Sequence, residues 1–126
     1  MSDQTTNSPK VYVYAYLDPR KPGNFVYDGS AFSYEPFYVG KGSMKASKRH
    51  LHLAKAHHGE NEFKERKIRR ILEAGLEPVI HRVAVQNQTE ACALEVKWIR
   101  TIGKGSKGPL TNIWPGGDLG PGHETL

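Results

Sequence analysis

Two short segments rich in aromatic and β-branched residues lie near the N-terminus, and they limit the fold more than any other feature. Residues 10–17 read KVYVYAYL and residues 36–40 read PFYVG, and such compositions are typical of β-strands. The stretch 18–24 (DPRKPGN) holds two prolines and a glycine, so we expect it to break the first strand. An irregular hairpin connection follows, in which Asp28 and Gly29 are expected to form the turn. The two strands are therefore predicted to pair in antiparallel fashion.

Helical patterns begin only after the second strand. A first helix is expected to start at Ser43 or Ser47 and to end at Ala56. A second helix is predicted over residues 61–74, with Gly75 just beyond its end, at the position that favours glycine. Two helices therefore separate the hairpin from the next strand.

The remaining elements are one strand and one helix. Residues 77–85 (EPVIHRVAV) alternate in part between apolar and polar side chains, which predicts a third strand. Thr89 is expected to cap a third helix, which Gly103 ends. The order β, β, α, α, β, α predicts an α+β fold, with a small, mostly antiparallel, three-stranded sheet flanked by helices.

The length and composition fit one soluble domain. We expect residues 1–9 to form a disordered tail, residues 10–117 a single domain, and residues 118–126 a flexible C-terminal tail. No apolar run reaches the roughly 20 residues of a membrane span, and the polar N-terminus does not resemble a signal peptide. The single cysteine, Cys92, excludes an intrachain disulfide. An intracellular protein, cytoplasmic or nucleoid-associated and not bound to a membrane, is expected.

Positive charge is concentrated in one part of the chain. The formal net charge is +5, and Lys and Arg outnumber acidic residues most strongly between Lys41 and Arg70. A positive region of this kind suits a polyanion, and nucleic acid is the commonest polyanion inside a cell. Charge alone does not separate a nucleic-acid-binding protein from other basic domains.

The third helix carries a carboxylate within its apolar stripe. Glu95 lies inside the arc formed by the apolar residues that recur along this helix, which are Ala91, Leu94, Trp98 and Ile102. A buried charge that loses its partner costs about 3–5 kcal/mol, so compensation for Glu95 is expected. Either a divalent cation or an Arg or Lys at the border of the stripe would supply it.

Tyrosines recur on both predicted strands. Tyr12, Tyr14 and Tyr16 share one face of the first strand by its two-residue period. In the second strand Tyr38 stands just before Gly40, a residue that permits close approach of another group. Pairing would bring a tyrosine of each strand within a few ångströms. Such a cluster is either a packed aromatic face or part of a site.

In their order along the chain, these residues resemble the GIY-YIG nuclease family, and FYVGKG with the later GG stretch resembles its Lem-3-like branch. YVY at 12–14 and YVG at 38–40 stand where the family has its two triplets. The resemblance covers most of the chain. It extends to three residues of the later segments, which are Arg49, Glu95 and Asn112.

The resemblance implies a metal-dependent endonuclease that hydrolyses phosphodiester bonds, with one active site per chain. Glu95 would hold one Mg²⁺, with Mn²⁺ as the alternative, since hard cations prefer oxygen ligands. Arg49 would bind a phosphate oxygen, and Tyr14 or Tyr38 would orient or deprotonate the attacking water. The expected substrate is DNA, double-stranded or branched, bound by a monomer or a dimer with little sequence specificity.

The histidine of the site departs from the family pattern. Many members carry a histidine four residues after the arginine, where this chain has Leu53. The candidates are His52, which lies about 60° from Arg49 on a helical wheel and is preferred, and His50. A shift in register would instead favour His50 or Lys45.

Other residues are assigned supporting roles. Lys41 would supply a cation near Tyr38 or contact phosphate, and Asn112 would orient a site residue. One arc of the second helix holds four cations and no acid, and these cations are expected to contact the phosphate backbone: Arg66, Lys67, Arg69 and Arg70. The alternative function is a non-catalytic nucleic-acid-binding module that uses the same basic surface.

Overall fold

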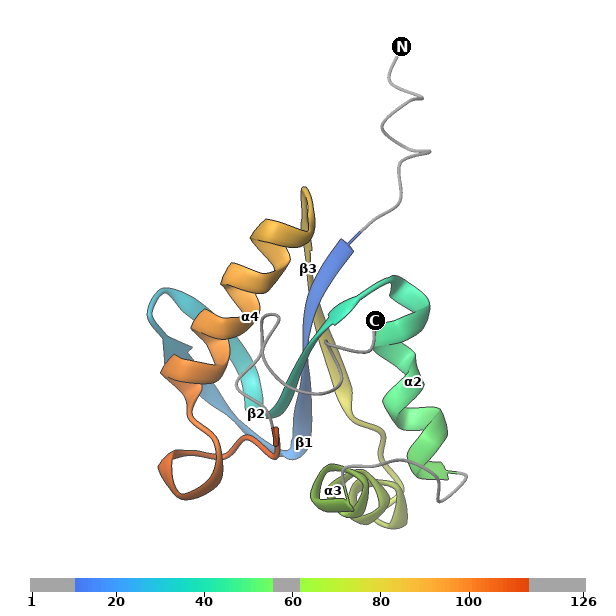
Figure 1. The fold of residues 1–126 in the computed structure, drawn as a ribbon. Helices are drawn as coiled ribbons and strands as arrows, with labels where there is room; N and C mark the ends of the chain where they lie inside the picture. The colour runs from blue at the N-terminus through green and yellow to red at the C-terminus, as the bar shows by residue number, and fades with distance from the viewer. Residues whose placement is uncertain (1–10, 56–61, 114–126) are drawn as a thin grey trace.

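The computed structural model describes residues 11–55 and 62–113, shown in colour in Figure 1. The tails expected at 1–9 and 118–126 lie outside the described residues. None of the described helices is long and apolar enough to cross a membrane. The elements, in chain order, are β1 (Val11–Tyr27), β2 (Ser30–Gly42), α2 (Met44–Lys55), α3 (Glu62–Glu73), β3 (Val79–Val85), α4 (Gln88–Ile102) and a 3₁₀ turn (Gly105–Lys107).

The three strands form one antiparallel sheet in the order β2-β1-β3. In the register of the sheet, Tyr14 of β1 lies opposite Gly40 of β2 and Arg82 of β3. Helix α4 packs on one face of the sheet, and α2 and α3 pack on the other (Figure 1). The predicted α+β fold with a three-stranded sheet is confirmed.

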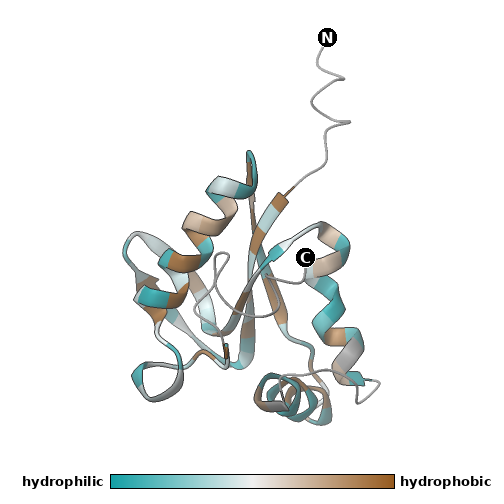
Figure 2. Ribbon diagram, viewed as in Figure 1, coloured by the Kyte–Doolittle hydropathy of each residue, from teal (hydrophilic) through white to brown (hydrophobic). Residues whose placement is uncertain are grey.

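The central strand β1 is buried on both faces, which explains its composition. Val13, Ala15 and Leu17 pack against α4, in a cluster that includes Trp98. The alternate side chains of the strand, with Tyr14 among them, point to α2 and α3. Figure 2 shows hydrophobic residues along β1 and β3 and on α4, whereas α3 carries many hydrophilic ones. The tyrosine face of β1 therefore looks toward the more polar pair of helices.

The expected break after residue 17 is wrong, because β1 continues to Tyr27. Three register shifts between β1 and β2, the first of them at Tyr16/Leu17, accommodate the stretch with two prolines. The long ribbon brings Phe32 to Trp98 of α4, with 5.3 Å between ring centroids. This packing stabilises the fold more than a local turn over residues 18–24 would. The turn at Asp28 and Gly29 is confirmed, and both have positive φ values, 48° and 87°.

Polar caps fix the helix ends. Ser43 rather than Ser47 caps α2, since its hydroxyl accepts from the backbone N–H of Ala46. The expected cap of α4 at Thr89 is wrong: Asn87 is the cap, and its side chain accepts from the backbone N–H of Glu90 at 2.9 Å. The N-cap choice depended on a two-residue offset that periodicity does not resolve. 

The glycines expected at helix ends are confirmed at both places where the structure tests them. Gly75 follows α3 with φ 82°, and Gly103 follows α4 with φ 95°. Behind Gly75, the backbone N–H of Leu76 donates to the carbonyl of Ile71, as in a Schellman motif. These ends set where β3 and the C-terminal segment begin.

Candidate active site

Three polar side chains, one each from β1, α2 and α3, contact one another in a row. The Tyr14 oxygen of β1 lies 2.8 Å from Nε2 of His50 on α2. Nδ1 of the same imidazole lies 2.6 Å from Nζ of Lys64 on α3. Tyr14 is only 3% exposed and Lys64 only 4%. Buried polar groups of this kind must satisfy one another, because little water reaches them.

Tyr38 of β2 completes the aromatic wall around the imidazole. Its ring centroid lies 4.7 Å from that of His50, and the Lys64 ammonium lies 4.6 Å from the Tyr38 ring centroid. A cation over a ring face is attracted by the ring quadrupole. The expectation that pairing brings tyrosines of both strands together is therefore met, and the cluster contains a histidine and a lysine as well.

Tyr16 belongs to the same face but serves the packing of α2. Its hydroxyl donates to the carbonyl oxygen of Ser47 at 2.6 Å and accepts from the backbone N–H of Leu51 at 3.2 Å. Burial raises the pKa of Tyr16 to about 12, against the opposing effects of the Leu51 N–H and of Arg82. Both hydrogen-bonding capacities of this hydroxyl are used within the fold.

Gly40 leaves the space that the Tyr14 phenol occupies. A Cβ placed on Gly40 would lie 2.6 Å from the Tyr14 oxygen and 2.7 Å from the ring carbon that bears it. No ordinary Cβ contact is that short, so any larger residue would displace the ring. The last residue of the YVG triplet is therefore explained by the tyrosine of the facing strand.

Glu95 of α4 is buried, as its place in the apolar stripe predicts. Glu95 is only 5% exposed. The negative charge of Glu95 helps to raise the pKa of both Tyr14 and Tyr38, so the carboxylate acts on the two phenols together. Glu95 is thus a buried acid whose charge reaches both phenols of the tyrosine pair.

The protonation states at neutral pH follow from burial. Burial, followed by the charges of neighbouring tyrosines and of Glu95, raises the pKa of Tyr14, and Arg49 opposes the rise. Burial also raises the pKa of Tyr38. Burial, Lys64 and Arg49 lower the pKa of His50 to about 3. The phenols are thus protonated and the imidazole neutral at pH 7, and a phenolate requires additional positive charge nearby.

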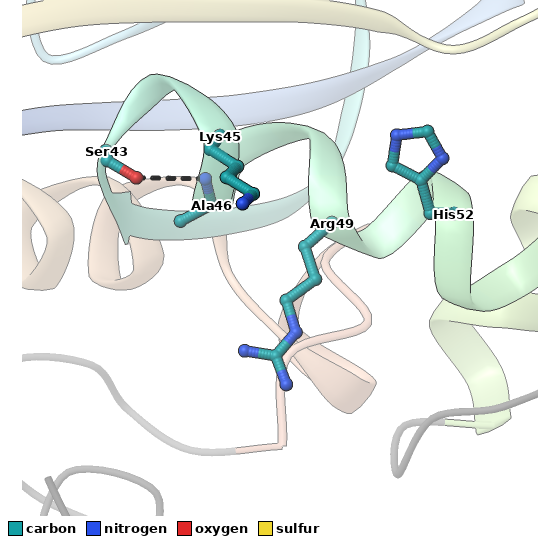
Figure 3. Close-up of a pocket in the computed structure, with 5 residues that line it drawn as sticks. All are labelled: Ser43, Lys45, Ala46, Arg49 and His52. Carbon is teal, nitrogen blue, oxygen red and sulfur yellow. Dashed lines mark hydrogen bonds between the residues drawn. The ribbon is translucent and has the colours of Figure 1, made fainter.

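Arg49 projects from α2 into a surface hollow of about 500 Å³ (Figure 3). The hollow is lined by Ser43, Lys45, Ala46, Arg49 and His52. The charge of Arg49 influences the pKa of both Tyr14 and His50, so the hollow adjoins the buried cluster electrostatically. The lining offers donors and cations that suit a phosphate group.

The two candidate histidines lie in different places. His50 contacts Tyr14, whereas His52 is exposed and lines the hollow beside Arg49. Ser47 and Ala54 mark the buried face of α2, and His50 lies on that side of the helix. The preference for His52 over His50 is therefore not supported by the arrangement, although His52 does share a surface with Arg49 as expected.

Asn112 ties the C-terminal segment to the free edge of β2. Its side-chain oxygen accepts from the backbone N–H of Val39 at 2.9 Å, and its amide group donates to the Val39 carbonyl at 2.7 Å. Thr111 also bonds to the carbonyl of Phe37. Val39 lies between the tyrosine and the glycine of the YVG triplet, so Asn112 holds the backbone on which Tyr38 is carried.

Lys41 does not share the face of the tyrosine cluster. It lies opposite Val13 in the register of the sheet and, by alternation along β2, on the same side as Val39. The structure thus places the backbone of Lys41 near the site but directs its side chain to the other face from Tyr38. Its expected role beside Tyr38 is not supported by this orientation.

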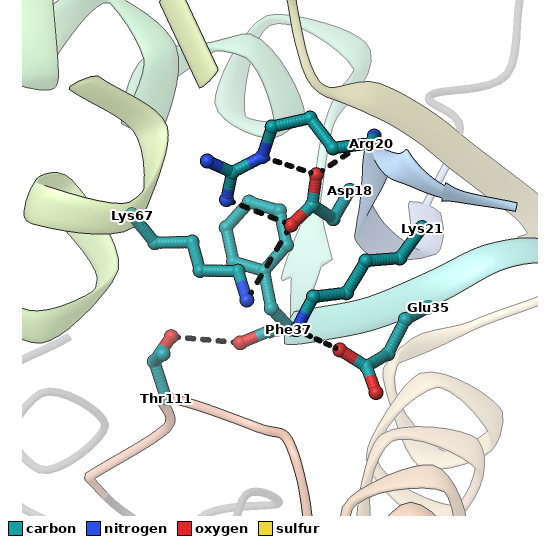
Figure 4. A network of polar contacts seen from close by, with 7 residues as sticks. All are labelled: Asp18, Arg20, Lys21, Glu35, Phe37, Lys67 and Thr111. Atoms are coloured by element: carbon teal, nitrogen blue, oxygen red, sulfur yellow. Dashed lines mark hydrogen bonds and ion pairs between the residues drawn. The ribbon is translucent and has the colours of Figure 1, made fainter. Parts of the chain in front are cut away.

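Two of the four cations assigned to α3 pair with acids, contrary to expectation. Lys67 Nζ lies 3.5 Å from Asp18, and Arg69 lies 3.8 Å from Glu65. Arg20 donates three times to the same Asp18 carboxylate, twice from its guanidinium and once from its backbone N–H, each time at 2.9 Å (Figure 4). For Lys67 the expectation failed because Asp18 is distant from α3 in the chain, whereas Arg69 pairs with Glu65 of the same helix, four residues before it, a spacing that the sequence already offers. The other two cations of that set are exposed: Arg66 and Arg70.

The charge state of Asp18 depends on this network. Burial acts to raise the pKa of Asp18, but the hydrogen bonds from Arg20, with the charges of Arg20 and Lys67, outweigh it and lower the pKa. The fully buried carboxylate therefore stays ionised and joins the ribbon of β1 to α3. Lys67 is part of this structural network, and it also lies over the ring of Phe37.

Lys64 is the site residue that the sequence analysis missed. It precedes Ile68 and Ile71, which are buried, by four and seven residues on α3. Lys64 therefore stands within an apolar stripe, as Glu95 does on α4. That same anomaly of position was the signal that could have found it.

The sheet order, the helices on both faces and the tyrosines of two neighbouring strands beside a buried carboxylate define an α+β domain of the GIY-YIG type. A family model described as LEM-3-like GIY-YIG domain matches residues 11–120. The chain therefore belongs to the LEM-3-like GIY-YIG family, and this membership suggests nuclease activity. Comparison with curated proteins gave no match, and comparison with solved structures gave none.

Proposed function

We propose that the protein is a metal-dependent endonuclease that hydrolyses phosphodiester bonds in DNA, with one active site per chain and little sequence specificity of its own. One observation supports this above all: the buried Glu95 carboxylate acts on Tyr14 and Tyr38, phenols of two adjacent strands. A buried carboxylate next to two phenols is an arrangement that can hold a hard cation at the point where water and phosphate would meet.

A divalent cation suits this site. The described residues contain no cluster of three or more His, Cys, Asp or Glu that could enclose a metal. Mg²⁺ does not need such a cluster, since it keeps several waters and binds through one or two carboxylates and substrate phosphates. Glu95 would hold it, with Mn²⁺ as the alternative. When bound, the cation supplies positive charge that lowers the pKa of nearby water and neutralises phosphate oxygens.

The protein side chains then divide the remaining tasks. Arg49 would bind a non-bridging phosphate oxygen from the hollow, where its planar fork matches a phosphate. Tyr14 would orient the attacking water and, as a phenolate, accept its proton. Arg49 already opposes the raised pKa of Tyr14, so positive charge in this region favours loss of the phenol proton. Tyr38 would close the other side of the water site.

Binding to DNA would depend mainly on the phosphate backbone. Lys45 and Arg49 line the hollow, and Arg66 and Arg70 are exposed on α3. Contacts of this type give affinity that falls with salt and carry no sequence information. A single site per chain is suited to cutting one strand per binding event, by a monomer or by one subunit of a dimer.

Cleavage of supercoiled plasmid and of branched oligonucleotides tests the proposal. We expect nicked products with Mg²⁺ and none with excess EDTA. Glu95→Gln should lower the rate by more than about a hundredfold, because it removes the charge that holds the cation. The matched control is Glu77→Gln, on an exposed residue paired with Lys55 at the surface, which should cut at the wild-type rate.

The alternative of a non-catalytic binding module makes a different prediction in the same assay. Such a protein would bind the DNA in a salt-dependent manner without producing nicks, and EDTA would change nothing. Cleavage by Glu95→Gln at the wild-type rate would refute the role of Glu95 directly.

A further inference from the structure

Lys64 occupies a position where a lysine is unexpected, and it contacts the imidazole of the site. It is 4% exposed, its Nζ lies 2.6 Å from His50 Nδ1, and it lies 4.6 Å from the Tyr38 ring centroid. It comes from α3, whereas His50 comes from α2. The contact therefore links two helices through the site and is not a local interaction within one of them.

The chemistry of an ammonium group fixes the direction of this hydrogen bond. An ammonium has three donors and no acceptor, so at this contact Lys64 donates and Nδ1 accepts. A neutral imidazole that accepts at Nδ1 carries its proton on Nε2. That Nε2 lies 2.8 Å from the Tyr14 oxygen, which must then accept.

We propose that Lys64 is a positioning residue that fixes His50 in its Nε2–H tautomer, so that the imidazole donates to the Tyr14 oxygen. This inference rests on the proposed function for its catalytic meaning, but the tautomer itself is a property of the free protein. Lys64 is not among the residues that line the hollow of Arg49, and it contacts His50, so it acts through His50.

The surroundings of His50 make its tautomer, rather than its charge, the variable that matters. The groups that face it are Tyr14 and Tyr16 of β1, Tyr38 of β2, Arg49 beside it on α2, and Lys64 of α3. Burial and the charges of Lys64 and Arg49 keep the pKa of the imidazole at about 3. The ring is therefore neutral throughout the range in which the protein would work.

The tautomer decides what His50 can do for Tyr14. As a donor, Nε2–H stabilises a Tyr14 phenolate. In this tautomer Nε2 cannot accept the phenol proton, so the Tyr14 O–H is directed away from the imidazole. In the other tautomer, Nε2 would accept from the Tyr14 hydroxyl and hold the proton on the phenol, which raises the pKa of the phenol. Lys64 thereby favours the form of Tyr14 that can accept a proton from water.

Long-range ¹H–¹⁵N correlation spectra of the full chain, labelled with ¹⁵N-histidine and free of DNA and metal, measure the tautomer. His50→Gln identifies the His50 signals by their loss. We expect wild-type His50 to carry its proton on Nε2, Lys64→Met to shift it wholly or partly to Nδ1, and Lys64→Arg to retain Nε2–H. Lys55→Met, an exposed lysine on α2, is the matched control and should leave the signals unchanged.

The cleavage assay adds a functional readout. Lys64→Met should lower the rate at pH 7 roughly tenfold, the effect of a shift of about one pKa unit in the base, and should move the rising limb of the pH profile to higher pH. Wild-type His50 protonated on Nδ1, or an unchanged tautomer in folded Lys64→Met, overturns the proposal. If Lys64→Met does not fold, the wild-type tautomer decides. If the protein cleaves no DNA while the tautomer is as stated, the proposed function fails and this inference stands.

Discussion

The phenol of Tyr14 occupies the space that a Cβ on Gly40 would fill. A Cβ at that position would approach the phenol oxygen and ring to between 2.6 and 3.0 Å. The two residues face each other in the register of β1 and β2. The first triplet of the family pattern thus supplies the side chain, and the second supplies the gap through which it reaches His50.

Gly40→Ala should therefore destabilise the fold and displace Tyr14. Overpacking of this kind costs about 1–3 kcal/mol, because the buried ring is rigid and its hydroxyl end cannot move aside without losing the contact with His50. Urea denaturation would measure the loss of unfolding free energy. In a Tyr14→Ala background the same Gly40→Ala change should cost much less, since the clashing ring is gone. Equal losses in the two backgrounds would contradict the proposed clash.

Phenylalanine substitutions should separate the roles of the two tyrosines on β1. Tyr16→Phe leaves the Leu51 N–H and the Ser47 carbonyl without their buried partner, so we expect a loss of about 1–3 kcal/mol of stability. Tyr14→Phe should change stability less but lower the cleavage rate by more than about a hundredfold. Paired measurements of unfolding free energy and of cleavage rate check both. The reverse pattern would assign the chemistry to Tyr16.

Asp18→Asn should lower the free energy of unfolding at pH 7 and change it little in acid. The folded-state pKa of Asp18 is held below its ordinary value of 3.8, so its ion pairs stabilise the fold above that value. This stability is lost as the pH falls through the folded pKa. We expect a loss of about 3 kcal/mol at pH 7, as for removal of one partner of a buried pair, and a smaller difference near pH 2.

Urea denaturation of wild type and variant at several pH values tests the Asp18 prediction. Glu77→Gln, whose pair with Lys55 is exposed, should cost less than about 1 kcal/mol at any pH. A difference for Asp18→Asn that stayed constant down to pH 2 would show that the charge of Asp18 does not matter.

The elements and the inward carboxylate were predictable from sequence because each depends on local periodicity. The strands, the helices, the Asp28–Gly29 turn and the burial of Glu95 all belong to this group. The continuation of β1 beyond residue 17 was not predictable, because it depends on packing of the ribbon against Trp98. Local propensity gives way to tertiary contacts in such cases.

The composition of the site was only partly predictable for a similar reason. His50 and His52 lie within one turn of α2, and which of them points inward depends on how the helix docks on the sheet. The pairing of Lys67 with Asp18 joins residues far apart in the chain, and no local pattern indicates it. Lys64 differs, since its place in an apolar stripe was visible in the sequence.

Asn112→Ala should loosen the edge of β2 at the YVG triplet. The substitution removes both hydrogen bonds to the Val39 backbone, which lies on β2, an edge strand of the sheet that the described residues form. We expect faster amide hydrogen exchange at Val39 and about a tenfold lower cleavage rate, because Tyr38 is carried on the loosened backbone. 

Thr111→Val is the control for Asn112→Ala, since it removes one side-chain bond to Phe37 but keeps the backbone N–H bond to the same carbonyl. It should leave exchange at Val39 near the wild-type rate. Faster exchange at Val39 without any loss of cleavage would show that the edge need not be rigid for the reaction. Unchanged exchange in Asn112→Ala would instead mean that the C-terminal segment stays docked through Thr111 and Leu110 alone, whose backbone bonds to Phe37 and Gly103 remain.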